Sequence, residues 1–413
     1  MTAQMIRDVV IVTDYAYVNG GSAKVALVEA VALARSGMHV TVFSAVGPVG
    51  PELHDEPNLS VICLDAHDIL SDPSRMRAAT RGIWNLDAAR AMRDALAPLD
   101  PQHTVVHVHS WTKALSSSVL RIAIDGRFPI VMTLHDYFPM CPLGSLYNHR
   151  TQEICTLPPM RRRCALENCD SRSYAQKVWR YTRQAVQQTY AGVPARVRHF
   201  ITLSELSRSV LEPHLPRNAS FHAVANPIDV ERSQLADPGA SDAFSFVGRL
   251  SREKGAELFA AAAASIGARA IFVGDGECAE GVRRAYPAAD ILGWLPRADV
   301  ERHIRASRAI VFPSLWYEVS PLVIKEAAAV GIPSIVPRTS AAREAIVDGK
   351  TGLLFDRADP VDLAAKMQRL ADPQVARDMG HAAAERFWAA PEMMEKHLRE
   401  LLDVYECVLR EAA

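Results

Sequence analysis

The sequence predicts an α/β protein made of two doubly wound parallel sheets, and three observations support this fold class. Short apolar runs alternate with helical stretches along most of the chain, which is typical of parallel strands connected by helices. The 413 residues exceed what one hydrophobic core usually organises, so we expect two domains. A proline-containing, largely polar stretch at residues 225–242 interrupts the alternation, and we place the domain boundary at its start.

Composition excludes several classes of protein. An apolar content of 49% and a charged content of 23% are typical of a globular protein in water. The net charge of −1 provides no overall attraction to nucleic acid, and we find neither a signal peptide nor an apolar run long enough to cross a bilayer. Seven cysteines, an odd number, argue against a secreted disulfide framework. We therefore expect a cytoplasmic protein without a nucleic-acid partner.

The first predicted domain, residues 1–225, opens with a strand, a helix and a second strand. Gly20 and Gly21 lie at the first strand-to-helix turn, where the backbone can approach a phosphate or a sugar closely. The pattern is not a G-x-G-x-x-G fingerprint, so a standard dinucleotide site is disfavoured. A tight turn without a ligand also requires glycines, and that interpretation stays open.

Two further apolar strands of this domain end in histidines. The first delivers His107 and His109, and the second is followed directly by His135 and Asp136. Because the carboxyl ends of parallel strands line the ligand crevice, we expect these side chains to converge there. Hydrogen-bonded structural histidines are an equally good interpretation of His107 and His109. His135 and Asp136, placed just before a loop, are the better functional candidates.

An irregular loop at residues 138–170 contains four of the seven cysteines, namely Cys141, Cys155, Cys164 and Cys169. The last two have C-x4-C spacing, which suits zinc, although the wider gaps match no standard finger. A structural zinc site is therefore one interpretation, and thiols without metal or redox pairs are the others. Basic residues outnumber acidic ones between Arg150 and Arg198, which suits an anionic acceptor or the inner face of a membrane. A solvated helix face is the alternative.

The second predicted domain, residues 226–385, carries two cations at the end of its first strand. Arg249 follows this strand closely, and Lys254 lies at the start of the next helix. Arginine can bind a phosphate through two N–H groups and lysine acts as a point charge, so together they predict a clamp for a diphosphate. Gly274 and Trp294 mark turns after two later strands of the same sheet.

The stretch from Val311 to Pro333 is a strand, a loop and a helix with two carboxylates eight positions apart. Glu318 lies in the loop and Glu326 inside the helix. We expect Pro321 at the first helical position, with Ser320 before it as the cap. A helix that starts at the carboxyl end of a parallel strand directs unpaired N–H groups at a ligand, which favours an anion such as a nucleotide diphosphate. An ordinary strand-loop-helix unit with both glutamates solvated is the alternative.

Together these residues resemble the family-4 glycosyltransferases, which are retaining enzymes of the GT-B fold. The resemblance spans nearly the whole chain and is most specific from Phe246 to Phe355. The matching features are Gly20-Gly21, His135-Asp136, the Asn226-Pro227-Ile228-Asp229 junction, GRLSREKG (Gly248 to Gly255), VGDG (Val273 to Gly276), LGW (Leu292 to Trp294), and the E-x7-E pair of Glu318 and Glu326. Ser320 stands where many members have glycine, and no lysine precedes Gly20, which argues against a glucan synthase.

The resemblance implies two Rossmann-like domains that face each other across a cleft. The nucleotide-sugar would bind mainly to the second domain, and a helix at residues 386–413 would pack back on the first, acceptor-binding domain. Arg249 and Lys254 would neutralise the diphosphate. Glu326 would bind ribose hydroxyls, and Glu318 would contact the transferred sugar. The other implied donor contacts are Gly20, Gly21, Gly274, Trp294, Ser320, Leu322 and Val323.

The implied function is transfer of a sugar from a nucleotide-sugar to a glycan or lipid-linked acceptor, in cell-surface polysaccharide or glycoconjugate biosynthesis. In this family retention is usually described as same-face attack helped by the donor phosphate, so no protein nucleophile is assigned. His135, Asp136 and Glu318 are the residues expected at the reacting centre. The sequence has no D-x-D triplet, and no cofactor is expected for catalysis. A sugar-nucleotide 2-epimerase and a catalytically silent GT-B binding subunit are the alternatives.

Overall fold

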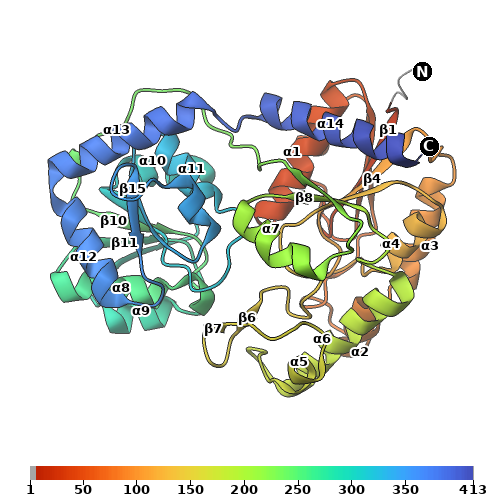
Figure 1. Cartoon of the computed structure of the whole chain (residues 1–413), viewed down its shortest axis with the longest axis horizontal. Coiled ribbons are helices and arrows are strands. Elements are labelled where there is room, and N and C mark those ends of the chain that lie inside the picture. The colour runs from red at the N-terminus through yellow and green to blue at the C-terminus, as the bar shows by residue number, and fades with distance from the viewer. Residues whose placement is uncertain (1–5, 413) are drawn as a thin grey trace. The chain divides into compact units, whose positions relative to one another are not determined.

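The computed structural model describes residues 6–412, which form two compact units (Figure 1). The first unit contains the residues up to Ser145, Leu157–Pro227 and the residues from Met394 onward. The second unit contains Leu146–Thr156 and Ile228–Met393. These spans differ from the expected domains in three places. Residues 146–156 belong to the second unit, and the boundary follows Pro227 instead of residue 225. The C-terminal segment that belongs to the first unit begins at Met394 instead of residue 386.

A parallel sheet of seven strands, in the order β3-β2-β1-β4-β5-β8-β9, forms the centre of the first unit. Its strands are β1 (Asp8–Val12), β2 (His39–Ser44), β3 (Leu59–Cys63), β4 (Thr104–Val108), β5 (Ile130–Thr133), β8 (His199–Thr202) and β9 (Ser220–Ala223). Residues 9–12 of β1 are at most 1% exposed, as expected for a parallel sheet covered on both faces. The strand order reverses direction between β1 and β4, so a ligand crevice is expected at the carboxyl ends of these strands.

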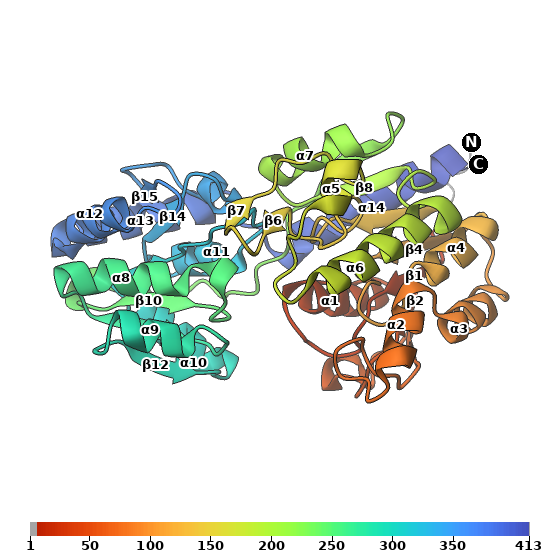
Figure 2. The same cartoon turned by 90° about the horizontal axis from the view of Figure 1, so that it is seen from below.

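Helices flank this sheet, and side-chain caps define where several of them begin. They are α1 (Gly21–Arg35), α2 (Arg75–Ile83), α3 (Leu86–Leu96), α4 (Ser118–Asp125), α5 (Arg162–Leu166), α6 (Tyr174–Val186), α7 (Glu205–Leu211), α14 (Met394–Ala412), a π turn at Gln187–Ala191, and short 3₁₀ turns at Pro51–Leu53 and Glu212–His214. Ser74, Asn85 and Ser173 accept a backbone N–H in the first turns of α2, α3 and α6. α6 packs beside α2 (Figure 2).

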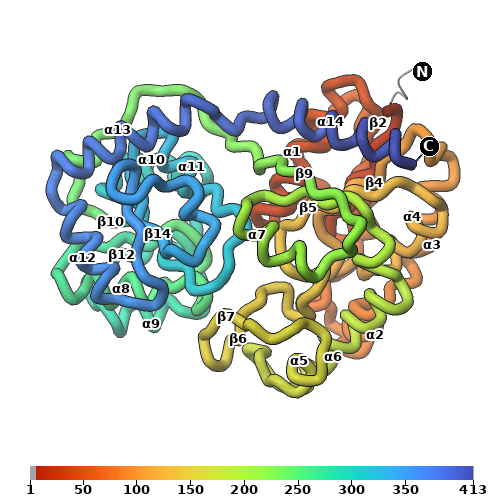
Figure 3. Tube along the Cα trace, viewed as in Figure 1, coloured from red at the N-terminus to blue at the C-terminus, as the bar shows by residue number. Residues whose placement is uncertain are grey.

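α14 packs against α1 and β4 of the first unit (Figure 3). Its buried residues are His397, Leu401, Val404, Tyr405, Val408 and Leu409. Their spacing of three or four positions places them on one stripe of the helix. Because two of these six residues are polar, α14 brings hydrogen-bonding groups as well as apolar surface to the interior of the first unit.

A parallel sheet of six strands, in the order β12-β11-β10-β13-β14-β15, forms the centre of the second unit. Its strands are β10 (Phe244–Val247), β11 (Ala270–Val273), β12 (Asp290–Gly293), β13 (Ala309–Val311), β14 (Ser334–Pro337) and β15 (Gly352–Phe355). The antiparallel pair β6 (Tyr147–Asn148) and β7 (Glu153–Ile154) also belongs to this unit. With two parallel, helix-flanked sheets, the predicted fold class is confirmed.

The helices of the second unit alternate with its strands. They are α8 (Ala256–Ile266), α9 (Ala279–Ala285), α10 (Arg297–Arg305), α11 (Leu322–Ala329), α12 (Pro360–Ala371), α13 (Pro373–Ala389), and short 3₁₀ turns at Pro238–Ala240, Arg252–Lys254 and Ala341–Ala345. In the core, the ring of Phe272 lies between those of Phe246 and Phe259, with centroids 5.9 Å and 4.9 Å away. Among residues 6–412, no helix combines the length and the apolar composition that crossing a membrane requires.

Candidate functional site

The start of α11 in the second unit lacks a side-chain cap. Pro321 occupies the cap position, one residue earlier in the helix than expected, and has no N–H of its own. Ser320, expected as the cap, does not cap the helix. Its hydroxyl is buried without a hydrogen-bond partner among the described residues. The first N–H groups of a helix have no partner within it, so this end of α11 offers donors and a positive dipole end to an anion.

Glu318, in the loop that precedes α11, is held by three hydrogen bonds to one oxygen. Its Oε1 atom accepts from Lys254 Nζ at 2.6 Å, from Ser314 Oγ at 3.0 Å and from Trp316 Nε1 at 2.5 Å. The side chains of Lys254 and Glu318 are 23% and 11% exposed. The structure therefore brings the lysine expected at the diphosphate and the carboxylate expected at the sugar into direct contact.

Arg249 extends into solvent beside a buried carboxylate that sequence reasoning missed. Its Nη2 atom lies 3.2 Å from Oε1 of Glu253, and the same oxygen accepts a hydrogen bond from Ser251 at 2.7 Å. Burial raises the pKa of Glu253, but Ser251, its own backbone N–H and Arg249 lower it, so the net pKa is below its usual value. Glu253 remains ionised and orients Arg249. The only indication of Glu253 in the sequence was its place between two cations in GRLSREKG.

Two glycines allow the loops at the carboxyl ends of β10, β11 and β13 to come close together. Gly255 has a φ of 72°, and a Cβ atom there would lie 2.1 Å from the carbonyl oxygen of Pro313. Gly274 has a φ of 140°, and a Cβ atom there would lie 2.0 Å from the carbonyl oxygen of Gly248. Any side chain at either position would push these loops apart.

The remaining residues expected at the donor lie along the same edge of the sheet. Leu322 and Val323 are the first two residues of α11, and both are half-buried. Glu326 lies one turn further along, on the same face of the helix as Leu322, and is also half-buried. Trp294 follows β12 and is 79% exposed.

In the first unit, His135 belongs to a network of imidazoles around a buried carboxylate. Its Nε2 atom lies 2.9 Å from Nδ1 of His109, and Nε2 of His109 lies 3.0 Å from Oε2 of Glu29. The other oxygen of Glu29 lies 2.8 Å from Nε2 of His397 in α14. Glu29 and His397 were not predicted as site residues, because their side chains meet only through the packing of α1 against α14.

Proton positions in this network follow from the partners of each ring nitrogen. His397 donates from Nδ1 to the carbonyl of Ala225 at 2.7 Å and from Nε2 to Glu29, so it carries both protons and a positive charge. Burial lowers and Glu29 raises the pKa of His397, with a net pKa above its usual value. The 3.0 Å distance from Nε2 of His109 to Oε2 of Glu29 favours a proton on this nitrogen, which leaves Nδ1 of His109 to accept from His135. His135 is left with a bare Nδ1.

Neutral His135 agrees with its surroundings. Burial, together with the neighbouring His109, lowers the pKa of His135 to about 3. By surface exposure the residue as a whole is half-buried. A neutral imidazole with a bare ring nitrogen can accept a hydrogen bond from a sugar hydroxyl.

Asp136 follows His135 and is a carboxyl group that titrates near neutral pH. Burial raises its pKa to about 6, although the N–H of Phe138 and the charges of Lys113 and Arg183 lower it. Oδ1 of Asp136 accepts the Phe138 N–H at 2.9 Å. A carboxyl group with such a pKa can exchange a proton with a reacting hydroxyl at physiological pH.

Gly20 and Gly21 lie at the start of α1, beyond the carboxyl end of β1. Gly20 is the N-cap residue with a φ of 126°, a conformation that other residues rarely adopt, and no side chain caps the helix. Both glycines are exposed. This uncapped helix start is at the same edge of the first sheet as His135, since all strands of that sheet are parallel.

Within the described part of the chain, one group of three ligand-type side chains is compact enough for a metal ion. It consists of Glu29, His107 and His109, whose donor atoms lie within 4.8 Å of one another. Both ring nitrogens of His107 already have hydroxyl partners, Tyr405 and Thr133, each at 2.7 Å. The group is therefore explained as a hydrogen-bonded network without a metal.

The four cysteines expected as zinc ligands do not form one ligand set, which corrects the sequence-based expectation. Cys155 belongs to the second unit and the other three to the first, and no three described cysteines have their sulfurs within 4.8 Å of one another. Cys164 and Cys169 instead surround an ammonium group, with their sulfurs 3.6 Å and 3.2 Å from Nζ of buried Lys177. The spacing of cysteines in sequence could not reveal that the loop divides between two units.

Comparisons with known proteins cover both units. The family model described as Glycosyltransferase Family 4 matches residues 19–232, and the model described as Glycosyl transferases group 1 matches residues 241–372. A D-inositol 3-phosphate glycosyltransferase of Corynebacterium diphtheriae is 27% identical over 416 residues, covering 92% of this chain and 90% of the relative. One from Arthrobacter sp. (strain FB24) is 25% identical over 373 residues, covering 86% and 82%.

Solved structures share the fold. Sucrose-phosphate synthase from Thermosynechococcus elongatus aligns with a TM-score of 0.73 and 20% identity, covering 98% of this chain and all (100%) of that one. Anabaena Alr3699/HepE in complex with UDP aligns with a TM-score of 0.64 and 15% identity, covering 97% and 100%. At these identities the likeness concerns the fold alone.

Proposed function

Because the chain belongs to glycosyltransferase family 4, we propose that it transfers a sugar, with retention, from a nucleotide-sugar to a hydroxyl group of its acceptor. The observation that carries the proposal is the Lys254–Glu318 pair, 2.6 Å apart, in the loops that lead to the uncapped start of α11. It combines a phosphate-binding cation with a sugar-binding carboxylate beside a helix end that favours anions.

The second unit is proposed to bind the donor. Arg249 and Lys254 neutralise the diphosphate, and the N–H groups of Leu322 and Val323 bind its oxygens. Glu326 binds the ribose hydroxyls. As the glycosyl–phosphate bond breaks, negative charge develops on the departing diphosphate, so the cations and the helix end stabilise the transition state more than the ground state.

The first unit is proposed to supply groups to the transferred sugar and the acceptor. His135 accepts a hydrogen bond from a sugar hydroxyl at its bare Nδ1, and the Asp136 carboxylate accepts one from the attacking hydroxyl. Glu318 of the second unit contacts the sugar. The nucleophile in this scheme is the acceptor hydroxyl, which attacks the sugar on the face that the diphosphate leaves and gives its proton to the departing phosphate.

Two acceptor classes follow from different observations. The first candidate is a glycan or lipid-linked acceptor in cell-surface polysaccharide or glycoconjugate biosynthesis, and the family resemblance supports it. A small phosphorylated polyol is the second candidate, supported by the relatives named for D-inositol 3-phosphate, which align over most of this chain.

A thermal-shift screen with UDP-, GDP- and ADP-sugars, followed by turnover assays, tests the function. Donor binding raises Tm by mass action, and product NMR reads the anomeric configuration. Arg249→Ala and Glu326→Ala are expected to lower kcat/KM for the donor by about tenfold or more. Arg283→Ala, which removes an exposed cation 3.8 Å from Glu280 on α9, is the matched control.

The outcomes separate the alternatives. Conversion of the donor without any acceptor indicates the 2-epimerase, and nucleotide binding without turnover on any acceptor indicates a silent binding subunit. Unchanged donor kinetics in both Arg249→Ala and Glu326→Ala would contradict the proposed donor site. Inversion of the anomeric configuration would contradict the retaining mechanism.

A further inference from the structure

A buried cluster of one amine and two thiols lies between α5 and α6 of the first unit, apart from the residues assigned to the donor and the acceptor. Nζ of Lys177 lies 3.2 Å from Sγ of Cys169 and 3.6 Å from Sγ of Cys164. Lys177 is 1% exposed, Cys169 6% and Cys164 7%. Because both sulfurs lie at hydrogen-bonding distance from the same nitrogen, they are also neighbours of each other.

The charge of Lys177 is compensated by sulfur. Within residues 6–412, the hydrogen bonds of its Nζ atom go to these two sulfurs, and no ion pair joins it to a carboxylate. Burial lowers the pKa of Lys177, but Cys169, Cys164 and Cys141 raise it, and the net pKa is above its usual value. A buried cation is costly unless an anion lies beside it, so we assign a thiolate to Cys169, the closer of the two cysteines. A thiolate is the nucleophilic form of cysteine.

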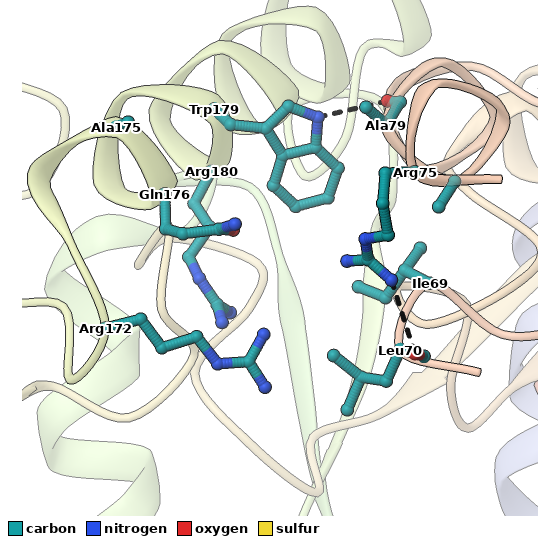
Figure 4. Close-up of a pocket in the computed structure, with 10 residues that line it drawn as sticks. Ile69, Leu70, Arg75, Ala79, Arg172, Ala175, Gln176, Trp179 and Arg180 are labelled. Atoms are coloured by element: carbon teal, nitrogen blue, oxygen red, sulfur yellow. Dashed lines mark hydrogen bonds between the residues drawn. The ribbon is translucent and has the colours of Figure 1, made fainter. Parts of the chain in front are cut away.

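The α6 helix fixes the position of Lys177. Trp179 is two positions further along and therefore lies on roughly the opposite side of the helix. Figure 4 shows that side, where Nε1 of Trp179 donates to the carbonyl of Ala79 on α2 at 3.0 Å. Arg75 and Arg172 line a pocket beside this contact. With Trp179 held against α2, the side chain of Lys177 is directed at the segment that contains the two cysteines.

The two cysteines differ in how they are held. Cys164 belongs to α5, and the carbonyl of the next residue, Ala165, accepts a hydrogen bond from the hydroxyl of Tyr174 on α6 at 3.0 Å. Cys169 lies between α5 and α6, outside any helix or strand. A disulfide requires its two sulfurs to approach to about 2.05 Å. Cys169 can make this approach without breaking the hydrogen bonds of a helix.

We propose that Cys164 and Cys169 are a redox-active dithiol that a hydroperoxide converts to a disulfide, with Lys177 holding Cys169 as the attacking thiolate. The sulfur of Cys169 attacks one peroxide oxygen, the O–O bond breaks, and hydroxide leaves. Sulfur is oxidised to a sulfenic acid and the peroxide is reduced. The thiol of Cys164 then attacks this sulfur, so that an S–S bond forms, the S–O bond breaks, and the thiol proton leaves with the oxygen as water.

Peptide mapping of the full chain tests the proposal. Trypsin cleaves after Arg163 and Arg172, so both cysteines stay in one peptide, residues 164–172. The reduced protein is treated with one equivalent of hydrogen peroxide, denatured, alkylated with iodoacetamide and digested. We expect this peptide to be two hydrogens lighter and without alkyl groups, and dithiothreitol added before alkylation is expected to restore both alkylation sites.

Cys278 is the control within the same sample. It is 4% exposed, and burial raises the pKa of its thiol to about 11. Burial alone therefore does not make this thiol reactive, and Cys278 is expected to stay fully alkylated after the same peroxide treatment.

Two lysine variants separate the local charge from a general effect of charge. Lys177→Met removes the ammonium group and is expected to slow oxidation by about tenfold or more, because a thiol replaces the thiolate. Lys396→Met is the same substitution on α14, where Lys396 lies 3.8 Å from Glu400 at the surface. It is expected to change the rate by less than about twofold. Circular dichroism checks that both variants fold.

A cysteine variant identifies the attacking sulfur. Cys164→Ser removes the second thiol, so Cys169 is expected to stop at the sulfenic acid, which dimedone traps as an adduct that mass spectrometry detects. A dimedone adduct missing from Cys169 in this variant would overturn its role as the attacking thiolate.

The remaining outcomes also decide. Full alkylation of residues 164–172 in the peroxide-treated wild type overturns the dithiol, and a disulfide from Cys169 to a different cysteine overturns the pairing. Equal oxidation rates in the wild type and Lys177→Met overturn the role of the ammonium group. None of these measurements uses a sugar donor, so they stand or fall independently of the proposed transferase function.

Discussion

Nδ1 of His109 lies 2.9 Å from Nε2 of His135, and this contact connects a half-buried residue at the edge of the first sheet to a carboxylate in its interior. Glu29 lies on the other side of His109 and is held in turn by His397 of α14, 368 positions away in sequence. Along this chain, the partner of one ring nitrogen determines which nitrogen of the next imidazole carries the proton. The nitrogen of His135 that carries its proton therefore depends on the packing of α14.

Replacing Glu29 with glutamine is expected to lower the free energy of unfolding by about 3–5 kcal/mol, because the buried His397 imidazolium loses its carboxylate. Urea unfolding followed by circular dichroism measures the change. Glu212→Gln is the control, since its pair with Arg208 at 3.2 Å is on the surface and its loss is expected to cost about 0.5 kcal/mol or less. Equal losses in the two variants would contradict the role of Glu29.

Acid is expected to destabilise the first unit because the fold holds His107 and His135 in neutral form. Burial lowers the pKa of both in the folded state, that of His135 to about 3, whereas unfolded histidine has a pKa of about 6.5. Below about pH 6.5 the unfolded state binds more protons than the folded state. The free energy of unfolding therefore decreases as the pH is lowered, by up to about 1.4 kcal/mol per pH unit for each histidine.

Urea unfolding at pH values from 7.5 down to 5 measures this dependence. His135→Gln removes one of the two contributions and is expected to give a shallower slope. An identical slope in wild type and variant would show that His135 is protonated in the folded state.

Asp136 is expected to produce an acid limb in the pH profile of kcat/KM. Its pKa is raised to about 6, mainly by burial, so the ionised fraction falls as the pH drops through that value. Asp136→Asn is expected to remove this limb and to lower kcat/KM at pH 7.5 by about a hundredfold. Asp125→Asn, on the exposed end of α4, is expected to retain it. An unchanged profile in Asp136→Asn would contradict a role of the ionised Asp136 carboxylate in the reaction.

Glu318→Gln is expected to separate donor binding from turnover. Without the carboxylate, the charge of Lys254 is no longer neutralised, so binding of the nucleoside diphosphate product is expected to tighten by about threefold to fivefold. Loss of the contact to the sugar is expected to lower kcat by about a hundredfold. Calorimetry and steady-state kinetics measure the two effects. Weaker diphosphate binding in this variant would show that Lys254 needs Glu318 for its position.

The elements of both sheets could be predicted from sequence because they depend on local patterns. Buried parallel strands are short apolar runs, and turns after them contain glycine or proline. The same local patterns predicted that Lys254 and Glu318 follow strand ends of one sheet, where the structure has them. The prediction that Ser320 caps α11 was wrong, because whether a serine caps a helix depends on backbone geometry that residue type does not determine.

The partners of these residues could not be predicted. Glu29 occupies the buried stripe of an otherwise apolar helix, and nothing near it in sequence indicates His397. Arg75 and Arg172 share a pocket only because α2 packs beside α6. Contacts between distant segments depend on tertiary packing, and a single sequence contains no direct signal for them.

The packing of α14 also has a consequence for the order in which the protein is made. His397 and Tyr405, the partners of Glu29 and His107, leave the ribosome only after the whole of Ile228–Met393 has been synthesised. Throughout that time the first unit carries the carboxylate of Glu29 on α1 and the imidazole of His107 on β4 without these partners. The second unit can complete its core before α14 is made. The first unit, whose synthesis begins first, is therefore the last to complete its core.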